Sequence, residues 1–169
     1  MLKFYYSGAP NPTKVALFLE ESGLPYEAIP VDTRKGDQHK PDFLAINPNA
    51  KVPAIVDGDA VVFDSSAILI YLAEKTGKFL PKDPAKRADV MQWLFWQMGG
   101  LGPMSGQNNH FSNYAADKIQ YAMDRYRNEV NRLYGVMDKR LADRPFLAGE
   151  YSIADMASYP WVVPHERQG

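Results

Sequence analysis

The stretch of sequence that decides the fold runs from residue 49 to residue 68 and reads NAKVPAIVDGDAVVFDSSAI. Asp57-Gly58 separates two short apolar runs, which is the pattern of a tight β-hairpin. Val52 precedes a proline, so its backbone is restricted to extended conformations. Ser65 then opens a run with apolar residues at helical spacing, which closes at Gly77. The stretch therefore predicts a hairpin that leads directly into a helix.

Two parts of this stretch suit a short peptide that carries a negative charge. The extended backbone at Val52-Pro53 offers N–H and C=O groups with which a bound peptide can pair as another strand would. The helix start at Asp64-Ser65 offers backbone N–H groups and a partial positive charge, which favour a carboxylate. Because X-Pro turns and helix caps are common, the same residues also fit a hairpin followed by an ordinary capped helix.

The composition excludes several classes of protein. The 169 residues allow one large domain or two small ones, and the apolar content of 46% supports a packed core. A formal net charge of −1 gives no support for nucleic acid or an anionic membrane as a partner. The chain has no cysteine, which excludes a disulfide scaffold, a cysteine nucleophile and a thiolate metal site. His39, His110 and His165 lack the spacing of metal ligands, so we predict no metal.

The two ends of the chain give further expectations. The apolar run in residues 1–6 is too short for a signal peptide, and no run approaches membrane-spanning length, so we expect a cytoplasmic protein. Residues 161–163 are still apolar shortly before the chain stops at Gly169. We therefore expect the C-terminal helical region to be truncated.

The order of the predicted elements divides the chain in two. Before residue 78 it runs strand, helix, strand, helix, strand, strand, helix, which is the thioredoxin-like α/β plan and needs a mixed sheet. Segment 77–84 contains glycine and proline and forms the boundary. We predict a thioredoxin-like domain over 1–78 and an all-helical domain over 79–169. The expected elements are strands 2–6, 26–31, 54–56 and 60–63, and helices 13–22, 41–46, 65–76, 84–98 and 118–141.

Two features of the predicted helical domain concern helix ends. Ser152 and Asp155 stand at capping-box spacing, and Tyr151 and Met156 stand at hydrophobic-staple positions. This box is predicted to serve folding, so neither Ser152 nor Asp155 is assigned to catalysis. Residues 99–103 contain three glycines and a proline, which we expect to break or kink the preceding helix.

Together these features resemble the glutathione transferase superfamily. In that superfamily the residue before a cis-proline pairs with the cysteinyl backbone of glutathione, and an acidic residue followed by serine holds the γ-glutamyl end. The matching residues here are Val52, Pro53, Asp64 and Ser65, with aspartate where most members have glutamate. The resemblance implies glutathione as co-substrate and extends to the two-domain architecture and to the box at Ser152.

A closer resemblance covers essentially the whole chain. It is to the bacterial nu-class glutathione transferases, also called glutathione-dependent disulfide-bond oxidoreductases. Its most specific segment is residues 92–104, which read QWLFWQMGGLGPM. Other matching segments are Pro10-Asn11, residues 18–21 (FLEE), residues 71–77 (YLAEKTG), residues 106–108 (GQN) and Arg125-Tyr126.

The loop around Asn11 is where the glutathione sulfur would be activated. Three side chains compete for it on the sequence alone, namely Ser7, Asn11 and Thr13, and Asn11 equally fits a helix N-cap. The resemblance to the nu class implies that Asn11 orients the sulfur. The family commonly has threonine where this chain has Ala9, so one hydroxyl donor is missing and weaker thiol activation is expected.

The resemblance also implies the remaining glutathione contacts. Gln38 and Lys51 would hold the glycyl end, and Arg125 would reach the sulfur region from the helical domain as a second catalytic residue. Each has a simpler interpretation, because loop residues such as Gln38 and Lys51 are often only solvated and Arg125 lies in a charged helical run. Trp93 and Trp96 are assigned to the core or to a dimer surface rather than to substrate.

The resemblance therefore implies a homodimeric, glutathione-dependent disulfide-bond reductase. The thiolate of bound glutathione would attack a small disulfide, and a second glutathione would resolve the mixed disulfide. Two alternatives stay open. One is a conventional glutathione S-transferase that conjugates electrophiles, and the other is a non-catalytic glutathione-binding sensor or interaction protein.

Overall fold

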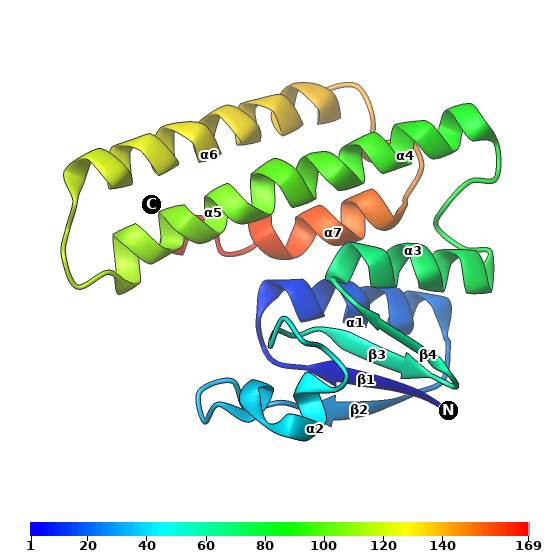
Figure 1. Ribbon diagram of the computed structural model, residues 1–169. Coiled ribbons are helices and arrows are strands. Elements are labelled where there is room, and N and C mark those ends of the chain that lie inside the picture. Colours follow the sequence, from blue (N-terminus) through cyan, green and yellow to red (C-terminus); the bar gives the residue numbers. More distant parts are fainter. Residues whose placement is uncertain (169) are drawn as a thin grey trace. The chain divides into compact units, whose positions relative to one another are not determined.

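The computed structural model describes residues 1–168 and separates into two compact units, Met1–Leu80 and a second that begins at Pro81. Figure 1 colours the first unit from blue to turquoise and the second from green to red. Among the described residues, no helix combines the length and the apolar character that crossing a membrane requires.

The first unit contains a four-stranded mixed sheet in the order β2-β1-β3-β4. β1 (Leu2–Tyr6) pairs in parallel with β2 (Tyr26–Pro30) and antiparallel with β3 (Ala54–Asp57). β3 forms a hairpin with β4 (Ala60–Phe63), and Gly58 in its turn has φ 60°, in the left-handed region that such turns require. The thioredoxin-like mixed sheet that the element order predicts is confirmed.

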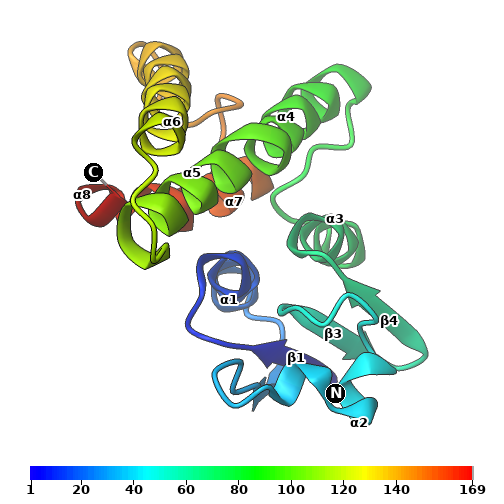
Figure 2. The same ribbon diagram turned by 60° about the vertical axis from the view of Figure 1, so that its left-hand side comes forward.

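Helices cover both faces of this sheet. α1 (Pro10–Ser22) and α3 (Ser65–Thr76) pack side by side on one face, and the short α2 (Pro41–Leu44) lies on the other (Figures 1 and 2). α3 has the bounds that the periodicity predicts, and Gly77 ends it in the left-handed conformation. The apolar residues buried on this face of the sheet include Phe18, Leu19, Ile55, Ile68, Leu69 and Leu72.

A smaller apolar cluster holds α2 to the sheet. It consists of Val31, Phe43 and Ala54, and we call it the α2-side cluster. Val52 packs against it from the segment that precedes β3. The cluster therefore connects the packing of α2 directly to the segment in which the candidate peptide-binding residues lie.

α1 begins earlier than the sequence predicts. The residue pattern predicts a helix over 13–22 with Asn11 as its N-cap, but the helix begins at Pro10 and Ala9 occupies the N-cap position. Proline fits the first turn because its fixed φ is helical and its missing N–H has no helical partner there. The Thr13 N–H already donates to the Ala9 carbonyl at 3.3 Å. The interpretation of Asn11 as an N-cap is therefore wrong, and Asn11 belongs to the first turn itself.

The second unit is mostly helical, as predicted. Its long helices are α4 (Pro84–Trp96), α5 (Gly102–Asn109), α6 (Gln120–Leu141) and α7 (Ile153–Val162), followed by the short α8 (His165–Gln168). α4 packs against α7, and α5 packs against α6 (Figure 1).

The glycine-rich run between α4 and α5 does not break the helix. Gln97–Leu101 forms a π-helical turn, so the ribbon continues from α4 into α5 (Figure 1). A Cβ added at Gly102 would lie 2.6 Å from the side-chain nitrogen of Gln97, so glycine here makes room for a buried amide. Pro103 falls in the first turn of α5. The predicted break of the chain's helical course does not occur, because a wider π-helical turn replaces the regular α-helix at these residues. The predicted kink stays a prediction.

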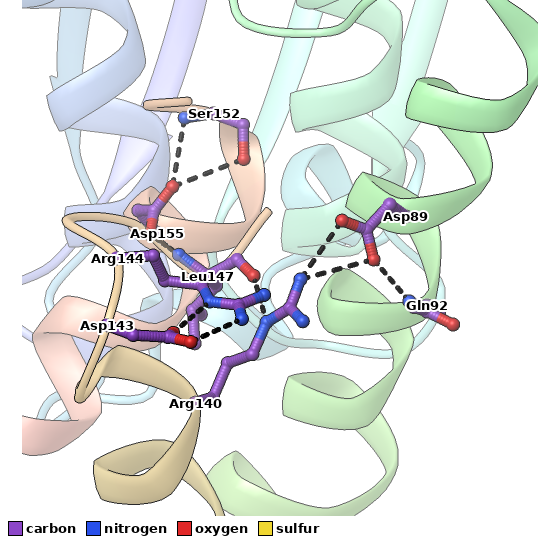
Figure 3. A network of polar contacts seen from close by, with 8 residues as sticks. All are labelled: Asp89, Gln92, Arg140, Asp143, Arg144, Leu147, Ser152 and Asp155. Carbon is purple, nitrogen blue, oxygen red and sulfur yellow. Dashed lines mark hydrogen bonds and ion pairs between the residues drawn. The ribbon is translucent and has the colours of Figure 1, made fainter. Parts of the chain in front are cut away.

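A polar network ties α6 to α4 in the second unit (Figure 3). Arg140 of α6 donates to the Leu147 carbonyl at 2.7 Å and to Asp89 of α4 at 3.1 Å. The Arg140 guanidinium also lies 5.1 Å from the centroid of the Trp93 ring. Trp93 therefore has a structural contact within this unit, in keeping with its assignment to packing.

The predicted capping box at the start of α7 is confirmed. The Ser152 hydroxyl accepts from the Ala154 N–H, and the Asp155 carboxylate accepts from the Ser152 N–H at 3.0 Å. Asp155 also accepts from the Leu147 N–H at 2.9 Å, so it closes the preceding loop as well (Figure 3). Burial raises the pKa of Asp155, because desolvation disfavours its charged form, although these hydrogen bonds act in the opposite direction.

Candidate functional site

The strand register of the first unit brings four separate parts of the chain to one edge of the sheet. Tyr5 of β1 lies opposite Ala54 of β3, and Ala54 lies opposite Phe63 of β4. β1 and β4 therefore end where β3 begins. β2 runs parallel to β1 and ends at the same edge, with Tyr6 beside Pro30. The segments that leave or enter the sheet at this edge carry Asn11, Gln38, Pro53 and Asp64.

The segment before β3 is fixed from several sides. The Val52-Pro53 peptide bond is cis, Pro53 is buried, and Val52 packs on the α2-side cluster. Asn47, which is 2% exposed, donates to the Lys51 carbonyl at 2.6 Å and accepts from the Asn49 N–H at 2.9 Å. Sequence reasoning missed this supporting role, because an asparagine in a turn-forming segment gives only a weak signal.

The start of α3 carries an acid and a hydroxyl at the same edge. Asp64 is the N-cap, with φ 72° and ψ 125°, a backbone conformation that is uncommon for a residue with a side chain. Its Oδ1 accepts from the N–H groups of Ser66 at 2.9 Å and Ala67 at 3.3 Å, and no described residue is seen to donate to Oδ2. Ser65 follows as the first helical residue and is 3% exposed. One carboxylate oxygen therefore caps the helix, and the other is available to a ligand.

The hydrogen bonds in the first turn of α1 reduce the number of side chains that could contact the glutathione sulfur. Asn11 is half-buried there, and the prolines on either side of it carry no N–H. The Thr13 hydroxyl donates to the Ala9 carbonyl at 3.0 Å, so its proton is used within the helix. Of the three side chains predicted to compete for the sulfur, Asn11 and Ser7 remain.

Lys14, farther along α1, is a buried charged residue that sequence reasoning missed. Its exposed fraction is 0%, and its Nζ donates to the Ser65 hydroxyl at 3.3 Å. Desolvation lowers the pKa of Lys14 to about 7, while the charge of Asp64 acts to raise it. A signal was present, since Lys14 stands four residues before Phe18, on the same helix face as the apolar residues.

Gln38 and Lys51 lie on loops at this edge. Gln38 belongs to the short 3-10 turn Asp37–His39, and its amide nitrogen donates to the Thr33 carbonyl at 3.3 Å. Its Oε1 is buried and has no hydrogen-bond partner among the described residues. The Lys51 side chain is exposed. Their assignment to a glycyl carboxylate stays a prediction.

Arg125 lies in the second unit, on α6, where its side chain is exposed. It lines a cavity of about 670 Å³ whose walls include Met104, Tyr121 and Tyr126. Tyr126 is stacked against Phe111 with their ring centroids 5.4 Å apart. The predicted role of Arg125 at a sulfur atom stays a prediction. Within residues 1–168, no three His, Cys, Asp or Glu side chains come together as metal ligands would.

Comparison with protein families gives a match over the first unit. The family model "Glutathione S-transferase, N-terminal domain" matches residues 9–75. That range begins at the N-cap of α1 and ends within α3, so it contains the segments that meet at the edge of the sheet.

Two relatives from Escherichia coli strain K12 match nearly the whole chain. Disulfide-bond oxidoreductase YfcG is 53% identical over 176 residues, which cover 99% of this chain and 82% of the relative. Disulfide-bond oxidoreductase YghU is 46% identical over 171 residues, which cover 95% of this chain and 59% of the relative. The chain therefore spans most of the first relative but less than two thirds of the second.

Solved structures share the fold closely. A glutathione transferase from Pseudomonas putida, crystallised with one glutathione disulfide per subunit, has a TM-score of 0.94 and 46% identity. The match covers 96% of this chain and 74% of that one. A glutathione transferase from Burkholderia graminis, with two glutathione molecules bound per subunit, has a TM-score of 0.93 and 45% identity, covering 96% and 72%.

Proposed function

The chain belongs to the glutathione S-transferase family, and we propose that it is a glutathione-dependent disulfide-bond reductase in which bound glutathione supplies the reactive thiolate. The observation that carries the proposal is the strand register of the first unit. It collects the first turn of α1, the cis Val52-Pro53 segment and the Asp64-Ser65 helix start at one edge of the sheet.

Each group of glutathione has a counterpart at this edge. The backbone of its cysteinyl residue pairs with the main chain of Val52, as an added strand would. The γ-glutamyl end is a zwitterion, so its ammonium suits Asp64 Oδ2 and its carboxylate suits the Ser65 hydroxyl and the start of α3. Gln38 and Lys51 are the nearest candidates for the glycyl carboxylate.

Asn11 is the residue that we assign to the sulfur. A free thiol has a pKa of about 8.5, and lowering it by two units requires roughly 2.7 kcal/mol of preferential thiolate stabilisation. The side-chain amide of Asn11 and the positive end of α1 supply a donor and a favourable potential at that point. The chain has no cysteine, so both thiols of the reaction come from glutathione.

The reaction balances with two glutathione molecules. The first thiolate attacks one sulfur of the substrate disulfide, the S–S bond breaks, and the other sulfur leaves as a thiolate that takes up a proton. The second glutathione thiolate attacks the mixed disulfide and releases the remaining substrate thiol. The substrate disulfide is reduced to two thiols while two glutathiones are oxidised to one glutathione disulfide.

The named properties of the relatives support this assignment. The 53%-identical relative is named a disulfide-bond oxidoreductase. The Burkholderia graminis structure holds two glutathione molecules per subunit, the number that the reaction consumes, and the Pseudomonas putida structure holds glutathione disulfide, its product. We further propose the nu class, a homodimer and a cytoplasmic location, because the reaction draws on a reduced glutathione pool.

One observation favours conjugation of electrophiles, or simple glutathione binding, as a second candidate. The N-cap of α1 is Ala9, which has no side-chain donor, and the helix start has no side-chain cap. Sulfur activation then rests on fewer donors than the family commonly has. Faster turnover of a chloronitrobenzene than of hydroxyethyl disulfide would support conjugation, and tight glutathione binding without turnover of either would support binding alone.

The test is reduction of hydroxyethyl disulfide by glutathione, with Asn11→Ala beside the intact protein. We expect the rate to fall at least tenfold while glutathione affinity changes little, because Asn11 contacts the sulfur rather than the peptide ends. Asn131→Ala, at an exposed position of α6, is the matched control and should be fully active. No disulfide reduction by the intact protein would refute the proposal.

A further inference from the structure

Asn47 is a buried polar side chain in the segment between α2 and β3. It is 2% exposed, and the backbone of the residues that follow it uses both ends of its amide. Its Nδ2 donates to the Lys51 carbonyl at 2.6 Å, and its Oδ1 accepts from the Asn49 N–H at 2.9 Å. The amide therefore closes residues 47–51 into one turn, which ends directly before Val52.

The main chain of this turn is held as well. The Asn47 N–H donates to the Phe43 carbonyl at 2.8 Å, and the Asn47 carbonyl accepts from the Ala50 N–H at 3.0 Å. Phe43 belongs to the α2-side cluster, so these bonds join the turn to a packed part of the unit. Ala50 has φ 54°, a left-handed conformation that residues with a side chain seldom adopt. Such conformations persist only where the surrounding contacts impose them, and they cluster at ligand sites.

The hydrogen bond to the Lys51 carbonyl also determines the direction of a second group. A peptide unit is planar, and in a trans unit the C=O and the N–H point in opposite directions. The unit between Lys51 and Val52 is trans. Because its carbonyl points at the buried Asn47 amide, the Val52 N–H points away from that side chain. Within residues 1–168, no acceptor for this N–H is seen.

We propose that Asn47 is a positioning residue for the Val52 N–H, which donates to the cysteinyl carbonyl of bound glutathione. The inference rests on the proposed function, because it deepens the strand-like pairing of the same site. Asn47 does not touch the ligand. It holds the peptide plane between Lys51 and Val52, so the donor is oriented before the ligand binds and the turn loses little freedom on binding.

The chief rival is a purely structural role, in which Asn47 closes the turn without directing any group at the ligand. The two roles differ in which ligand atoms sense a substitution. A general defect of the turn would weaken every glutathione-like ligand by a similar factor. Loss of one oriented donor would weaken only those ligands that carry a good acceptor at the cysteinyl carbonyl.

The test compares the intact protein with Asn47→Ala by isothermal titration with three ligands. They are glutathione, a thioamide analogue whose cysteinyl C=O is replaced by C=S, and an ester analogue whose cysteinyl N–H is replaced by oxygen. Thioamide sulfur is a weaker acceptor than an amide oxygen, so the thioamide reports on the Val52 N–H. The ester lacks the donor that would pair with the Val52 carbonyl, so it reports on that carbonyl instead.

The expected result is a change in one preference alone. The intact protein should bind glutathione roughly three- to tenfold more tightly than the thioamide, the usual effect of one hydrogen bond between neutral groups. In Asn47→Ala this ratio should fall to near one. The ratio between glutathione and the ester should stay within about twofold of its value in the intact protein, because the Val52 carbonyl belongs to the next peptide plane.

Asn47→Ser covers the case in which the alanine variant does not fold. A serine hydroxyl can still accept from the N–H two residues on, as asparagine does in such turns. Its side chain lacks the amide nitrogen and is too short to reach the Lys51 carbonyl. Asn47→Ser should therefore keep the first half of the turn and lose the preference for glutathione over the thioamide.

Thr76→Val is the matched control. Like Asn47, the Thr76 side chain donates to one backbone carbonyl, that of Leu72, and accepts from one backbone N–H, that of Lys78. It lies at the end of α3, whereas the proposed ligand site includes the start of that helix. Thr76→Val should keep both ligand preferences of the intact protein even if it is less stable.

The outcomes separate the two proposals. An unchanged ratio between glutathione and the thioamide in both Asn47 variants would overturn the positioning role, whether or not the affinities fall. A ratio near one in the intact protein would do the same, and in both cases the proposed function would stand. Failure of the intact protein to bind glutathione would instead refute the proposed function, and the positioning role with it.

Discussion

The starts of α7 and α3 both carry an aspartate and a serine, but the two pairs serve different purposes. The start of α7 pairs Ser152 with Asp155, and both oxygens of that carboxylate accept from backbone N–H groups (Figure 3). The start of α3 pairs Asp64 with Ser65, but there one carboxylate oxygen accepts both backbone N–H groups. At the start of α7 both carboxylate oxygens are used by the backbone, whereas at the start of α3 only Oδ1 of Asp64 caps the helix.

The difference shows why a capping motif is not evidence of function by itself. Asp155 lies within its helix and reaches back to the loop, so its hydrogen bonds serve folding. Asp64 has φ 72°, a conformation that costs free energy in a residue with a side chain, and such residues cluster at functional sites. A buried lysine also stands behind the α3 start, whereas the partners of the Asp155 carboxylate belong to Leu147 and Ser152.

The largest expected effect comes from removing the charge at the α3 start. Asp64→Asn keeps an acceptor for the helix cap and tolerates a left-handed φ, but it loses the charged contact to the ligand ammonium. A hydrogen bond to a charged group contributes about 1.5–3 kcal/mol, so glutathione affinity should fall roughly tenfold to a hundredfold. The free energy of unfolding should change by less than about 0.5 kcal/mol, because asparagine caps nearly as well as aspartate. Titration calorimetry and urea unfolding measure the two quantities.

Ser152→Ala is the reciprocal experiment at the α7 start. It should lower the free energy of unfolding by about 1 kcal/mol through loss of the cap, while glutathione affinity stays within twofold of the intact protein. Equal affinity in Asp64→Asn and the intact protein would mean that both helix starts are only caps.

A second, smaller effect concerns the lysine behind the α3 start. The pKa of Lys14 is lowered to about 7 in the folded protein from an ordinary value of 10.5. Between these two values the unfolded chain binds a proton that the folded chain has released, so the free energy of unfolding rises with pH. From about pH 7 to about pH 9 the intact protein should gain on the order of 2 kcal/mol relative to Lys14→Met. Urea unfolding at several pH values measures that difference in slope.

The control for this pH dependence is Lys75→Met. The contact with Asp57 raises the pKa of Lys75, so its ammonium stays protonated over the same range in folded and unfolded chains. The Lys75→Met substitution should therefore leave the slope of the free energy of unfolding against pH unchanged. Parallel curves for the intact protein and Lys14→Met would mean that the buried ammonium keeps an ordinary pKa.

The sequence predicts the parts of this site that depend on local rules. Asp57-Gly58 predicts the hairpin, and the apolar spacing after Ser65 predicts α3, because turns and helices are determined by neighbouring residues. The hairpin also brings the segments before β3 and after β4 to the same end of the sheet, since Ala54 pairs with Phe63. Most of the residues proposed to bind glutathione can therefore be predicted without the structure.

The parts that were missed depend on contacts distant in sequence. The sequence does not indicate a role for Lys14, because periodicity considers apolar residues and nothing local shows that its ammonium contacts Ser65, 51 residues away. The sequence does not determine the start of α1, because Pro10 and Pro12 both fit a first turn and local rules do not choose between them. Gly102 was expected to break a helix, but its missing side chain makes room for Gln97.

The smallest expected effect concerns a third helix start, that of α1, which has no side-chain cap. Ala9 has φ −84° and ψ 161°, an extended conformation that threonine adopts readily. In Ala9→Thr the hydroxyl oxygen can accept from the Asn11 N–H and its proton can face the sulfur, so we expect up to about 1 kcal/mol of added stability and a several-fold faster disulfide reduction. Ala9→Val has the same shape without the hydroxyl, so the ratio of kcat/KM between the two variants isolates the donor. A ratio near one would show that Asn11 alone serves the sulfur at this helix start, and that the missing threonine does not limit the enzyme.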